Sequence, residues 1–506
     1  MRTLSNLSYI VIASFFLTFL AACQDIRHED TSEVEMSDFE ILKDEGLALS
    51  SRQIKDKIAS LCKNDGEGDI ANSTTRKHYL NQEGLVWIDR LGVKAQADSL
   101  VAFLETVEDQ GLNKGVFRVE QIKEDLKRAK NLDFDGKHKI NDVMARLEYN
   151  LTKAYFRYAA GQRFGFVNPL TALNKIQLVG KDTVKVKTKV FDLKLQQPDT
   201  RFFQQAIEKV RNDSITDFLR SVQPQGALYT SLLHELATAK GDYRQKVQVN
   251  LERARWRLDD PMETHDKYVF VNVAEQMLYA FTPDSTMVMK VCCGTVGNKT
   301  PLLNSYIKKM ELNPVWRMPY SIIKGIAGRA GSSAYFGRRR YNIYDGAGRK
   351  VDPSKVTRQQ LLSGRYSVVQ SSGAGNSLGK IIFRFDNPYA VYLHHTSSPW
   401  VFSQQNRCVS HGCVRVERPF DLAVFLLGDG QKDKAADIKY SMDHGTESKD
   451  SIDTARVIKN LPVQPQIPVY LNYFTLYANA NGRLREFNDV YGFDKLLYSQ
   501  LAPLVR

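Results

Sequence analysis

The sequence predicts an α+β protein with a mostly helical N-terminal part and a mostly antiparallel β C-terminal part. Over much of 46–246, apolar residues recur every three or four positions, as on one face of a helix. After about 247, short β-branched and aromatic runs alternate with turn residues, which indicates strands. A chain of 506 residues is also too long for one hydrophobic core, so we expect two or more domains.

Residues 1–22 have the pattern of an export signal. Arg2 is the only early charge, and the apolar run 9–22 is too short to cross a membrane comfortably. Leu-Ala-Ala directly precedes Cys23, as in a lipoprotein signal, which predicts acylation of Cys23 and cleavage before it. An ordinary secretory signal cut near Ala22 is the alternative. Either reading places the mature chain outside the cytoplasm.

Residues 23–45 are polar and acid-rich, and we interpret them as a tether. Two or more acyl chains on Cys23 would give a stable membrane anchor, whereas one chain would not. Gln24 is not the Asp that signals inner-membrane retention in some bacteria, so we expect a periplasm-facing lipoprotein of the outer membrane.

Three stretches of the N-terminal part predict helices whose apolar stripes are core faces. Ser99 is expected to cap one helix, which Gly111 ends. The others are 141–160 and 202–222, the latter ended by Pro224. Nothing in 46–246 has a catalytic pattern.

The C-terminal part predicts a series of strands, one helix and a late hairpin. The helix spans 422–427 and stops at Gly428, and the hairpin joins 469–477 to 482–490. The predicted strands are 267–273, 287–293, 308–315, 379–385 and 390–393.

Charge and cysteine content narrow the possible partners. The net charge of +13 favours an anionic partner, such as nucleic acid, acidic lipid or an anionic wall polymer, and a solvated basic surface without a specific partner is the alternative. The sequence contains no nucleic-acid-binding motif, so we expect no nucleic acid partner. Six cysteines in 506 residues are too few for a disulfide scaffold.

The richest stretch for chemistry is 392–420, which holds three of the nine histidines and two of the six cysteines. Cys413 follows a glycine, which allows a sharp turn that presents the sulfur beside backbone N–H groups. A thiolate nucleophile needs a nearby base. His394 lies 19 residues upstream, at the end of an apolar strand-like run. We therefore predict thiol acyl transfer, with Cys413 as nucleophile and His394 as base.

The neighbours of Cys413 receive supporting roles. The N–H groups of Gly412 and Cys413 are candidate oxyanion donors. Ser410 and His411 are expected to shape the turn. Arg415 either holds a substrate carboxylate bidentately or braces the loop.

Other chemistry fits the same residues less well. His395 is a weaker candidate for the base, because neighbours on a strand point to opposite faces. A Cys408–Cys413 disulfide would close a very short loop. A zinc site is a further alternative, although the spacing does not repeat as CxxC or HxxxH. Its candidate ligands are His394, His395, Cys408, His411 and Cys413.

Ser410-His411-Gly412-Cys413-Val414-Arg415-Val416, with Tyr392-Leu393-His394 upstream, resembles the L,D-transpeptidase (YkuD-type) catalytic domain. Segments 313–319, 373–380 and 489–492, with Phe383, extend the resemblance to the long YcbB-type branch. That branch carries a scaffold domain before the catalytic one. Relatives often have Asp after the catalytic-type His, where this chain has His395.

The resemblance implies a domain order. A lipoprotein signal (1–22) and a polar tether (23–45) precede a helical scaffold domain (46–246). A catalytic domain (247–506) follows, with a Gly- and Arg-rich insert (322–365) that we interpret as a mobile loop or lid. Within the insert, Arg338, Arg339 and Arg340 are candidate contacts for stem-peptide carboxylates, and a solvated charge cluster is the alternative.

The resemblance also implies a reaction on peptidoglycan. The thiolate attacks the carbonyl of the third residue of a tetrapeptide stem and releases the terminal D-alanine. The thioester then passes to an amine of a second stem, which forms a 3-3 cross-link. Alternatives are an L,D-carboxypeptidase with water as acceptor, attachment of a wall protein, and a non-catalytic wall-binding lipoprotein. Candidate substrate contacts are Arg415, Tyr392 and Asn376.

The resemblance implies no metal and no organic cofactor. Its expected partners are peptidoglycan stem peptides and, through lipidated Cys23, the membrane. Carbapenem-type β-lactams are the expected covalent inhibitors.

Overall fold

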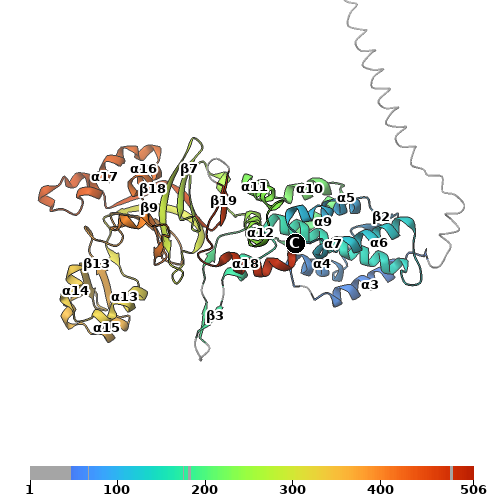
Figure 1. Ribbon diagram of the computed structural model, residues 1–506, viewed down its shortest axis with the longest axis horizontal. Coiled ribbons are helices and arrows are strands. Elements are labelled where there is room, and N and C mark those ends of the chain that lie inside the picture. Colours follow the sequence, from blue (N-terminus) through green and yellow to red (C-terminus); the bar gives the residue numbers. More distant parts are fainter. Residues whose placement is uncertain are drawn as a thin grey trace, which may run out of the picture. The chain divides into compact units, whose positions relative to one another are not determined.

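The structure is a computed structural model that describes residues 47–66, 68–89, 91–174, 176–179, 184–187, 189–478 and 483–506 (Figure 1). The predicted signal peptide, Cys23 and the predicted tether lie outside the described residues. The chain forms two compact units. The first contains Met1–Glu105 (described from residue 47), Phe117–Arg157 and Phe203–Phe218, and the second contains Thr106–Val116, Tyr158–Phe202 and Leu219–Arg506.

The first unit is helical. Its helices are α3 (Ser51–Asn64), α4 (Ile70–Leu80), α5 (Gln96–Glu105), α6 (Val119–Asn131), the first part of α7 (Ile140–Phe164), most of α9 (Thr200–Arg211) and the start of α10 (Ile215–Val222). The short strands β1 (Ile88–Asp89) and β2 (Gly92–Val93) pair with each other. Side chains of Ser50 and Asp69 cap α3 and α4 by accepting backbone N–H groups.

The core of the first unit is aromatic and contains one buried acid. Glu148 accepts hydrogen bonds from the backbone N–H groups of Val86 and Trp87 and from the Tyr79 hydroxyl. Burial raises the pKa of Glu148. Since both carboxylate oxygens accept hydrogen bonds, this acid is a structural element of the core.

Two predicted helices differ from the structure in their ends. α5 begins at Gln96, so Ser99 lies inside the helix, and Gly111, in the left-handed region at φ +77°, ends the short 3-10 helix that follows. The predicted helix 202–222 is two helices, α9 and α10. Asp213 between them has a φ of +51°, which an α-helix does not accommodate.

The second unit is built on a large mixed sheet, mostly antiparallel as predicted. Its hydrogen-bonded order is β14-β15-β17-β8-β7-β6-β18-β9-β5. β14 also pairs with β9, so the sheet closes on itself. The strands are β5 (Phe191–Asp192), β6 (Tyr268–Asn272), β7 (Met277–Thr282), β8 (Ser285–Gly294), β9 (Leu302–Leu312), β14 (Ile381–Phe385), β15 (Leu393–His394), β16 (Cys408–Ser410, beside β8), β17 (Val414–Val416) and β18 (Asn460–Asn472).

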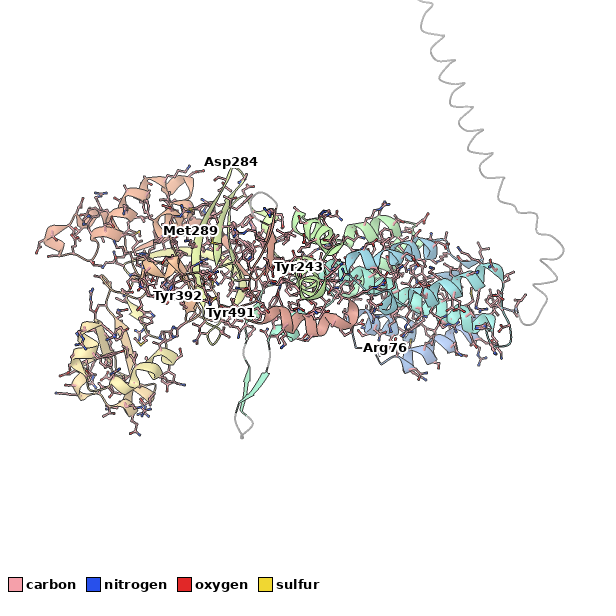
Figure 2. All side chains as sticks on the ribbon, viewed as in Figure 1. Arg76, Tyr243, Asp284, Met289, Tyr392 and Tyr491 are labelled. Carbon is pink, nitrogen blue, oxygen red and sulfur yellow. The ribbon has the colours of Figure 1, made fainter. Side chains whose placement is uncertain are left out.

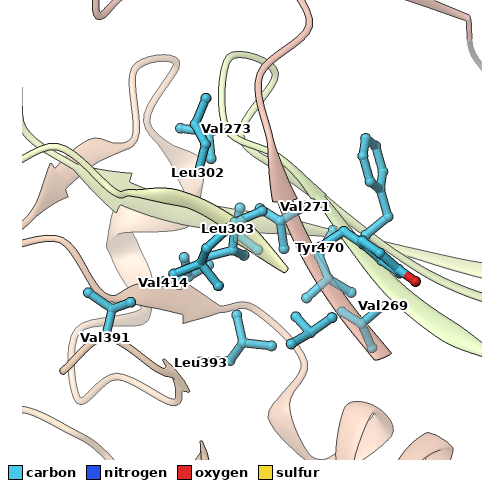
Figure 3. Close-up of a cluster of buried hydrophobic side chains, with 14 of the residues drawn as sticks. Val269, Val271, Val273, Leu302, Leu303, Val391, Leu393, Val414 and Tyr470 are labelled. Atoms are coloured by element: carbon cyan, nitrogen blue, oxygen red, sulfur yellow. The ribbon is translucent and has the colours of Figure 1, made fainter. Parts of the chain in front are cut away.

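Apolar residues of these strands form the hydrophobic core of the second unit. Val269, Val271, Leu303, Leu393 and Val414 lie within it (Figure 3). Because side chains alternate between the faces of a strand, burial of Leu393 and Val414 directs their chain neighbours to the other face.

Helices and hairpins complete the second unit. They are α8 (Pro169–Leu173), α11 (Ala227–Leu236), α12 (Gly241–Arg255), α16 (Pro419–Leu426), α17 (Ala435–His444), α18 (Phe493–Leu501), and the hairpins β3 (Ile176–Val179)–β4 (Val184–Lys187) and β19 (Leu476–Ala478)–β20 (Leu484–Glu486). The segment 432–460 was expected to be exposed, but α17 within it buries Ile438 and Met442.

The Gly- and Arg-rich insert is a folded subdomain with a hydrophobic core of its own (Figure 1). That core includes Met318, Ile323, Phe336, Leu361 and Val368. The elements are α13 (Tyr320–Ile326), α14 (Ser333–Arg338), α15 (Arg358–Leu362) and a sheet of order β10 (Trp316–Arg317), β13 (Ser367–Gln370), β11 (Tyr341–Tyr344) and β12 (Lys350–Val351). The prediction of a mobile loop therefore missed the apolar residues that are scattered among the arginines and glycines.

Within the part of the chain that the structure describes, no helix is long and apolar enough to cross a membrane.

Candidate active site

A parallel strand pair sets the position of the predicted base. In the β15–β17 pair, Leu393 lies beside Val414 and His394 lies beside Arg415. Leu393 and Val414 point into the core. His394 and Arg415 are therefore on the opposite face of the sheet.

The same register places the predicted nucleophile near that base. The Val414 N–H donates to the Tyr392 carbonyl at 3.1 Å, which extends the alignment so that Cys413 lies beside Tyr392. Tyr392 and His394 share a face because they are two residues apart. Cys413 and His394 are thus diagonal neighbours on one face, as a nucleophile and its base must be.

The turn before Cys413 depends on a glycine. Gly412 has a φ of +113°, a conformation that residues with a Cβ rarely adopt. Ser410 Oγ accepts the Gly412 N–H at 3.1 Å and donates to the Cys413 carbonyl at 2.5 Å. Ser410 therefore shapes the turn, as expected. Since the Gly412 N–H already has this partner, its predicted role as an oxyanion donor would require the bond to Ser410 to open.

A second layer of hydrogen bonds holds this turn. Thr300 Oγ1 donates to the Gly412 carbonyl at 2.9 Å and accepts the Gly294 N–H at 2.8 Å. The Tyr491 hydroxyl accepts the Thr300 N–H at 3.1 Å and donates to the Gly294 carbonyl at 2.7 Å. Tyr491 also stacks on Tyr473, with ring centroids 5.7 Å apart. Tyr491 (labelled in Figure 2) thus reaches the turn through Thr300.

Tyr491→Phe removes only the hydroxyl that joins Gly294 to Thr300. We expect kcat for thioester formation to fall roughly tenfold, because losing the two buried hydrogen bonds of this hydroxyl costs about 1–3 kcal/mol and loosens the turn. KM should change little, since Tyr491 contacts no site residue directly. Steady-state kinetics on a stem tetrapeptide checks this. Tyr498→Phe, in the same C-terminal segment, is the control, and equal effects of the two changes would contradict a positioning role.

The Cys413 thiol lies in a partly enclosed setting. Its Sγ is 4.0 Å from the Ala390 carbonyl oxygen. Burial raises the thiol pKa, and the backbone and hydroxyl of Tyr392, then Arg415 and Arg384, act in the opposite direction. The thiol is therefore neutral at rest, and it needs a base when it reacts.

His394, the predicted base, is buried on the same face as Cys413. The side chain is 4% exposed, and its Nδ1 has no hydrogen-bond partner among the described residues. Burial, followed by the charge of Arg415, lowers its pKa to about 3, although hydrogen bonds with the backbone of His395 and Leu378 act in the opposite direction. A buried nitrogen without a partner calls for an explanation, and readiness to accept a proton from the thiol supplies one.

His395 points away from this pair, as strand alternation predicts. Its Nδ1 accepts the Lys380 N–H at 3.1 Å. Burial, followed by the charge of Lys380, lowers its pKa to about 4. Because this bond occupies Nδ1, His395 supports the 379–380 segment.

The other predicted site residues fall into different environments. Arg415 is on the Cys413 face, and its Nε is buried without a partner among the described residues. His411 is exposed beside the turn. Asn376 is 1% exposed, and its amide donates to the carbonyls of Pro314 and Ser371. Asn376 therefore braces its own loop, and contact with substrate stays a prediction for it.

The five side chains considered as zinc ligands do not form a ligand set. Among the described residues, no three His, Cys, Asp or Glu side chains come together as a metal site. Cys408 and Cys413 are both free thiols. Burial raises the pKa of Cys408 to about 11, so this thiol is poorly suited to be a nucleophile.

Sequence reasoning missed several residues that shape the site. Ala390, Arg384, Thr300 and Tyr491 were not among the predicted site residues. Tyr491 lies within the Asp489–Gly492 match to relatives, which was a usable signal for it. Thr300 carries no motif, and its link to Gly412 spans 112 residues.

Comparison with known proteins matches two parts of the chain. Residues 266–446 match the family described as the L,D-transpeptidase catalytic domain (YkuD), and residues 73–236 match the family described as the scaffold domain. A Haemophilus influenzae protein named "Putative L,D-transpeptidase" is 26% identical over 309 residues. That alignment spans 59% of this chain and 59% of the relative.

Two solved structures show weak similarity. L,D-transpeptidase 3 from Mycobacterium tuberculosis has 12% identity and a TM-score of 0.17, over 30% of this chain and 52% of that one. The avibactam carbamoyl enzyme of Ldtfm has 11% identity and a TM-score of 0.19, over 59% and 72%. Scores this low carry no argument about the present chain.

Proposed function

We propose, from the premise that this chain belongs to the L,D-transpeptidases with a YkuD-type catalytic domain and a scaffold domain, that it cross-links peptidoglycan stems through a thioester on Cys413. One observation carries the proposal. Cys413 and the buried His394, with its unpartnered Nδ1, share one face of the β15–β17 pair.

The first half-reaction forms the thioester. His394 takes the proton of the Cys413 thiol, and the thiolate attacks the carbonyl carbon of the third stem residue. The resulting oxyanion needs a donor, and the Cys413 N–H is our candidate. The protonated His394 then gives its proton to the leaving D-alanine nitrogen as the C–N bond breaks.

The second half-reaction returns the enzyme to its starting state. An amine of a second stem attacks the thioester carbonyl, and His394 accepts a proton from that nitrogen. The C–S bond breaks and an amide forms, which is the 3-3 cross-link. The Cys413 thiolate finally recovers the proton from His394, so acid and base are balanced over the cycle.

Mass spectrometry of purified disaccharide-tetrapeptide incubated with the full-length protein tests this proposal. A cross-linked dimer with loss of one D-alanine supports transpeptidation. A disaccharide-tripeptide alone would instead show that water is the acceptor, as in an L,D-carboxypeptidase. Neither product, with an unmodified Cys413, would leave only a wall-binding role.

We also propose that the insert subdomain acts as a lid over the acyl-donor site. Residues 322–365 contain ten Lys and Arg but only two Asp, which favours an anionic stem. The three consecutive arginines of the insert differ in their contacts. Arg340 donates to the carbonyls of Ser372 and Ala374, and Arg339 stacks over Tyr335 at 4.3 Å. Arg338 projects from the end of α14 and is exposed.

Limited proteolysis tests the lid. Because the insert is folded, we expect cleavage at its edges and at exposed turns such as Gly346–Gly348. Saturating stem peptide or a covalent β-lactam should slow this cleavage severalfold. Cleavage in the exposed segment 446–448 serves as the internal control and should not change. An unchanged pattern at saturating ligand would contradict a lid.

We further propose that the mature protein begins at Cys23, carries lipid there, and faces the periplasm from the outer membrane. Cys23→Ala should either leave the signal uncleaved or release the protein into the soluble fraction, since the acyl chains supply the anchor. Fractionation and intact mass measure this. Normal cleavage together with unchanged membrane association would show that another part of the chain binds the membrane.

A further inference from the structure

A cavity of about 490 Å³ opens beside the predicted nucleophile, and its lining includes Lys308, Lys309, Arg384 and Tyr392. Tyr392 is the register neighbour of Cys413 (Tyr392 is labelled in Figure 2). The cavity also includes Ala390, whose carbonyl faces Cys413 Sγ at 4.0 Å. None of the three cations was among the predicted site residues.

Strand pairing connects the cavity to Cys413 in a single row. In the β9–β14 pair, Lys309 lies directly opposite Arg384. In the β14–β15 pair, Phe383 lies opposite Leu393, so Arg384 is level with Tyr392. The row continues from Tyr392 to Cys413.

This alignment places the cationic side chains on the same face as Cys413 and sets their distance from it. With strands about 4.8 Å apart, the Cα atoms of Lys309 and Cys413 are about 14 Å apart. Long cationic side chains on one face cover much of that distance.

A β-bulge adds a third cation. On β9, Ile307 pairs with Phe385 and Lys309 with Arg384, so Lys308 is an extra residue without a partner on β14. The β18 register shifts at the same point. Bulges redirect side chains and occur often beside active sites. Here the bulge lets Lys308 and Lys309 both line the cavity, although neighbours on a regular strand point to opposite faces.

The cations exceed the acids that neutralise them. Lys308 pairs with Asp386, and Arg384 Nε pairs with Glu311 Oε2 at 2.6 Å. Lys309 has no ion pair in the part of the chain that the structure describes. Like charges directly opposite on neighbouring strands destabilise a sheet. Glu311 already neutralises Arg384, so Lys309 is the excess positive charge opposite it, and a bound anion would offset that charge.

Ala390, which lines the cavity and contacts Cys413, has an uncommon backbone conformation. Ala390 has a φ of +53°, a left-handed conformation that non-glycine residues rarely adopt. Asn387 fixes it, because its Oδ1 accepts the Tyr389 and Val391 N–H groups and its Nδ2 donates to the Val391 carbonyl. Backbone strain of this kind is concentrated at functional sites.

We propose that this cavity is an anion subsite that binds a carboxylate of the acyl-donor stem, with Lys309 and Arg384 as its principal contacts. The proposal rests on the proposed function, since it assigns the substrate group that aligns the donor with Cys413. Two carboxylates of a tetrapeptide fit this chemistry. One is the terminal carboxylate of D-alanine, and the other is a side-chain carboxylate of the third-position diamino acid.

The test compares three donors on the full-length protein. They are a tetrapeptide with free carboxylates, one with the terminal carboxylate amidated, and one with the diamino acid carboxylate amidated. The proteins are the wild type, Lys309→Gln, and Lys459→Gln, an exposed lysine outside the cavity, as the control. Release of the fourth residue, as D-alanine or its amide, gives kcat and KM.

We expect Lys309→Gln to raise KM for the free-acid donor about tenfold with little change in kcat, the scale of losing one charged hydrogen bond. Lys459→Gln should match the wild type. Amidating the bound carboxylate should raise the wild-type KM by a similar factor. With that amidated donor, Lys309→Gln should cause no further increase in KM. Which amide shows this coupling identifies the carboxylate.

Two results would overturn the subsite. In the first, Lys309→Gln has the wild-type KM with all three donors. In the second, its KM rises equally with all three, which would show no coupling to either carboxylate. If the wild type turns over none of the donors, the proposed reaction fails separately. The subsite is then tested by calorimetry, which measures binding of the three peptides to Cys413→Ala with and without Lys309→Gln. The subsite is supported if Lys309→Gln weakens binding of the free-acid peptide but not of one amidated peptide.

Discussion

Cys413→Ala is expected to abolish both the thioester and the dimer. Without the sulfur no acyl-enzyme can form, and removing a nucleophile from a covalent mechanism costs roughly 10⁶-fold in rate. The backbone of the turn should persist, because it depends on Gly412, Ser410 and Thr300 rather than on the Cys413 side chain. Intact mass after incubation with stem tetrapeptide or with a carbapenem measures the loss.

Cys408→Ala is the matched control for that experiment. Cys408 lies five residues before Cys413, and burial raises its pKa to about 11. We expect this variant to form the same covalent adduct as the wild type. The adduct should map to Cys413 by peptide mass spectrometry. An adduct on Cys413→Ala, or turnover retained by it, would contradict the assignment of the nucleophile.

The thermal unfolding of both variants separates chemistry from folding. Each change removes one sulfur atom from a side chain that lies at the edge of the core, and neither leaves a charge unpaired. We therefore expect both variants to unfold close to the wild-type temperature. A large loss of stability in Cys413→Ala alone would mean that its lost activity reports on folding.

The sequence was most informative where one residue type is required by geometry. Gly412 was predicted to form a sharp turn before Cys413, and its φ of +113° agrees. The apolar alternation of the C-terminal part likewise predicted a mostly antiparallel sheet. Such signals are local, because they depend on one residue or on a period of two.

The pairing of distant segments was not predictable in the same way. β15 contains only Leu393–His394, too short for periodicity to show, and its parallel partner β17 begins 20 residues later. The Tyr491–Thr300 contact joins residues 191 positions apart. Hydrogen bonds over such separations follow from the packed fold, so a single sequence does not contain them in readable form.

The insert shows how composition can mislead. Its many arginines and glycines led to the prediction of a mobile loop. The structure shows that Ile323, Phe336, Leu361 and Val368 form a small core there. These apolar residues are spread over several short elements, so no single window shows a clear period. A burial pattern assembled from four elements becomes visible only in three dimensions.

His394→Ala is expected to lower kcat/KM for thioester formation by roughly 10²–10⁴-fold, the usual contribution of a general base. His395→Ala should cost far less, because the His395 ring faces the Lys380 N–H and not the thiol. The two variants form a matched pair, since they change adjacent residues at the end of β15. A crippled His395→Ala beside a mild His394→Ala would reverse the two roles.

The pH profile of kcat/KM gives an independent test of His394 as the base. Burial and then Arg415 lower its pKa to about 3, so the imidazole stays neutral and able to accept a proton across the usual assay range. We therefore expect no inflection near the ordinary histidine value of 6.5. Because burial raises the Cys413 pKa, the rate should instead keep rising on the alkaline side as more thiolate forms. An acid limb centred near 6.5 would contradict the buried His394 as the base.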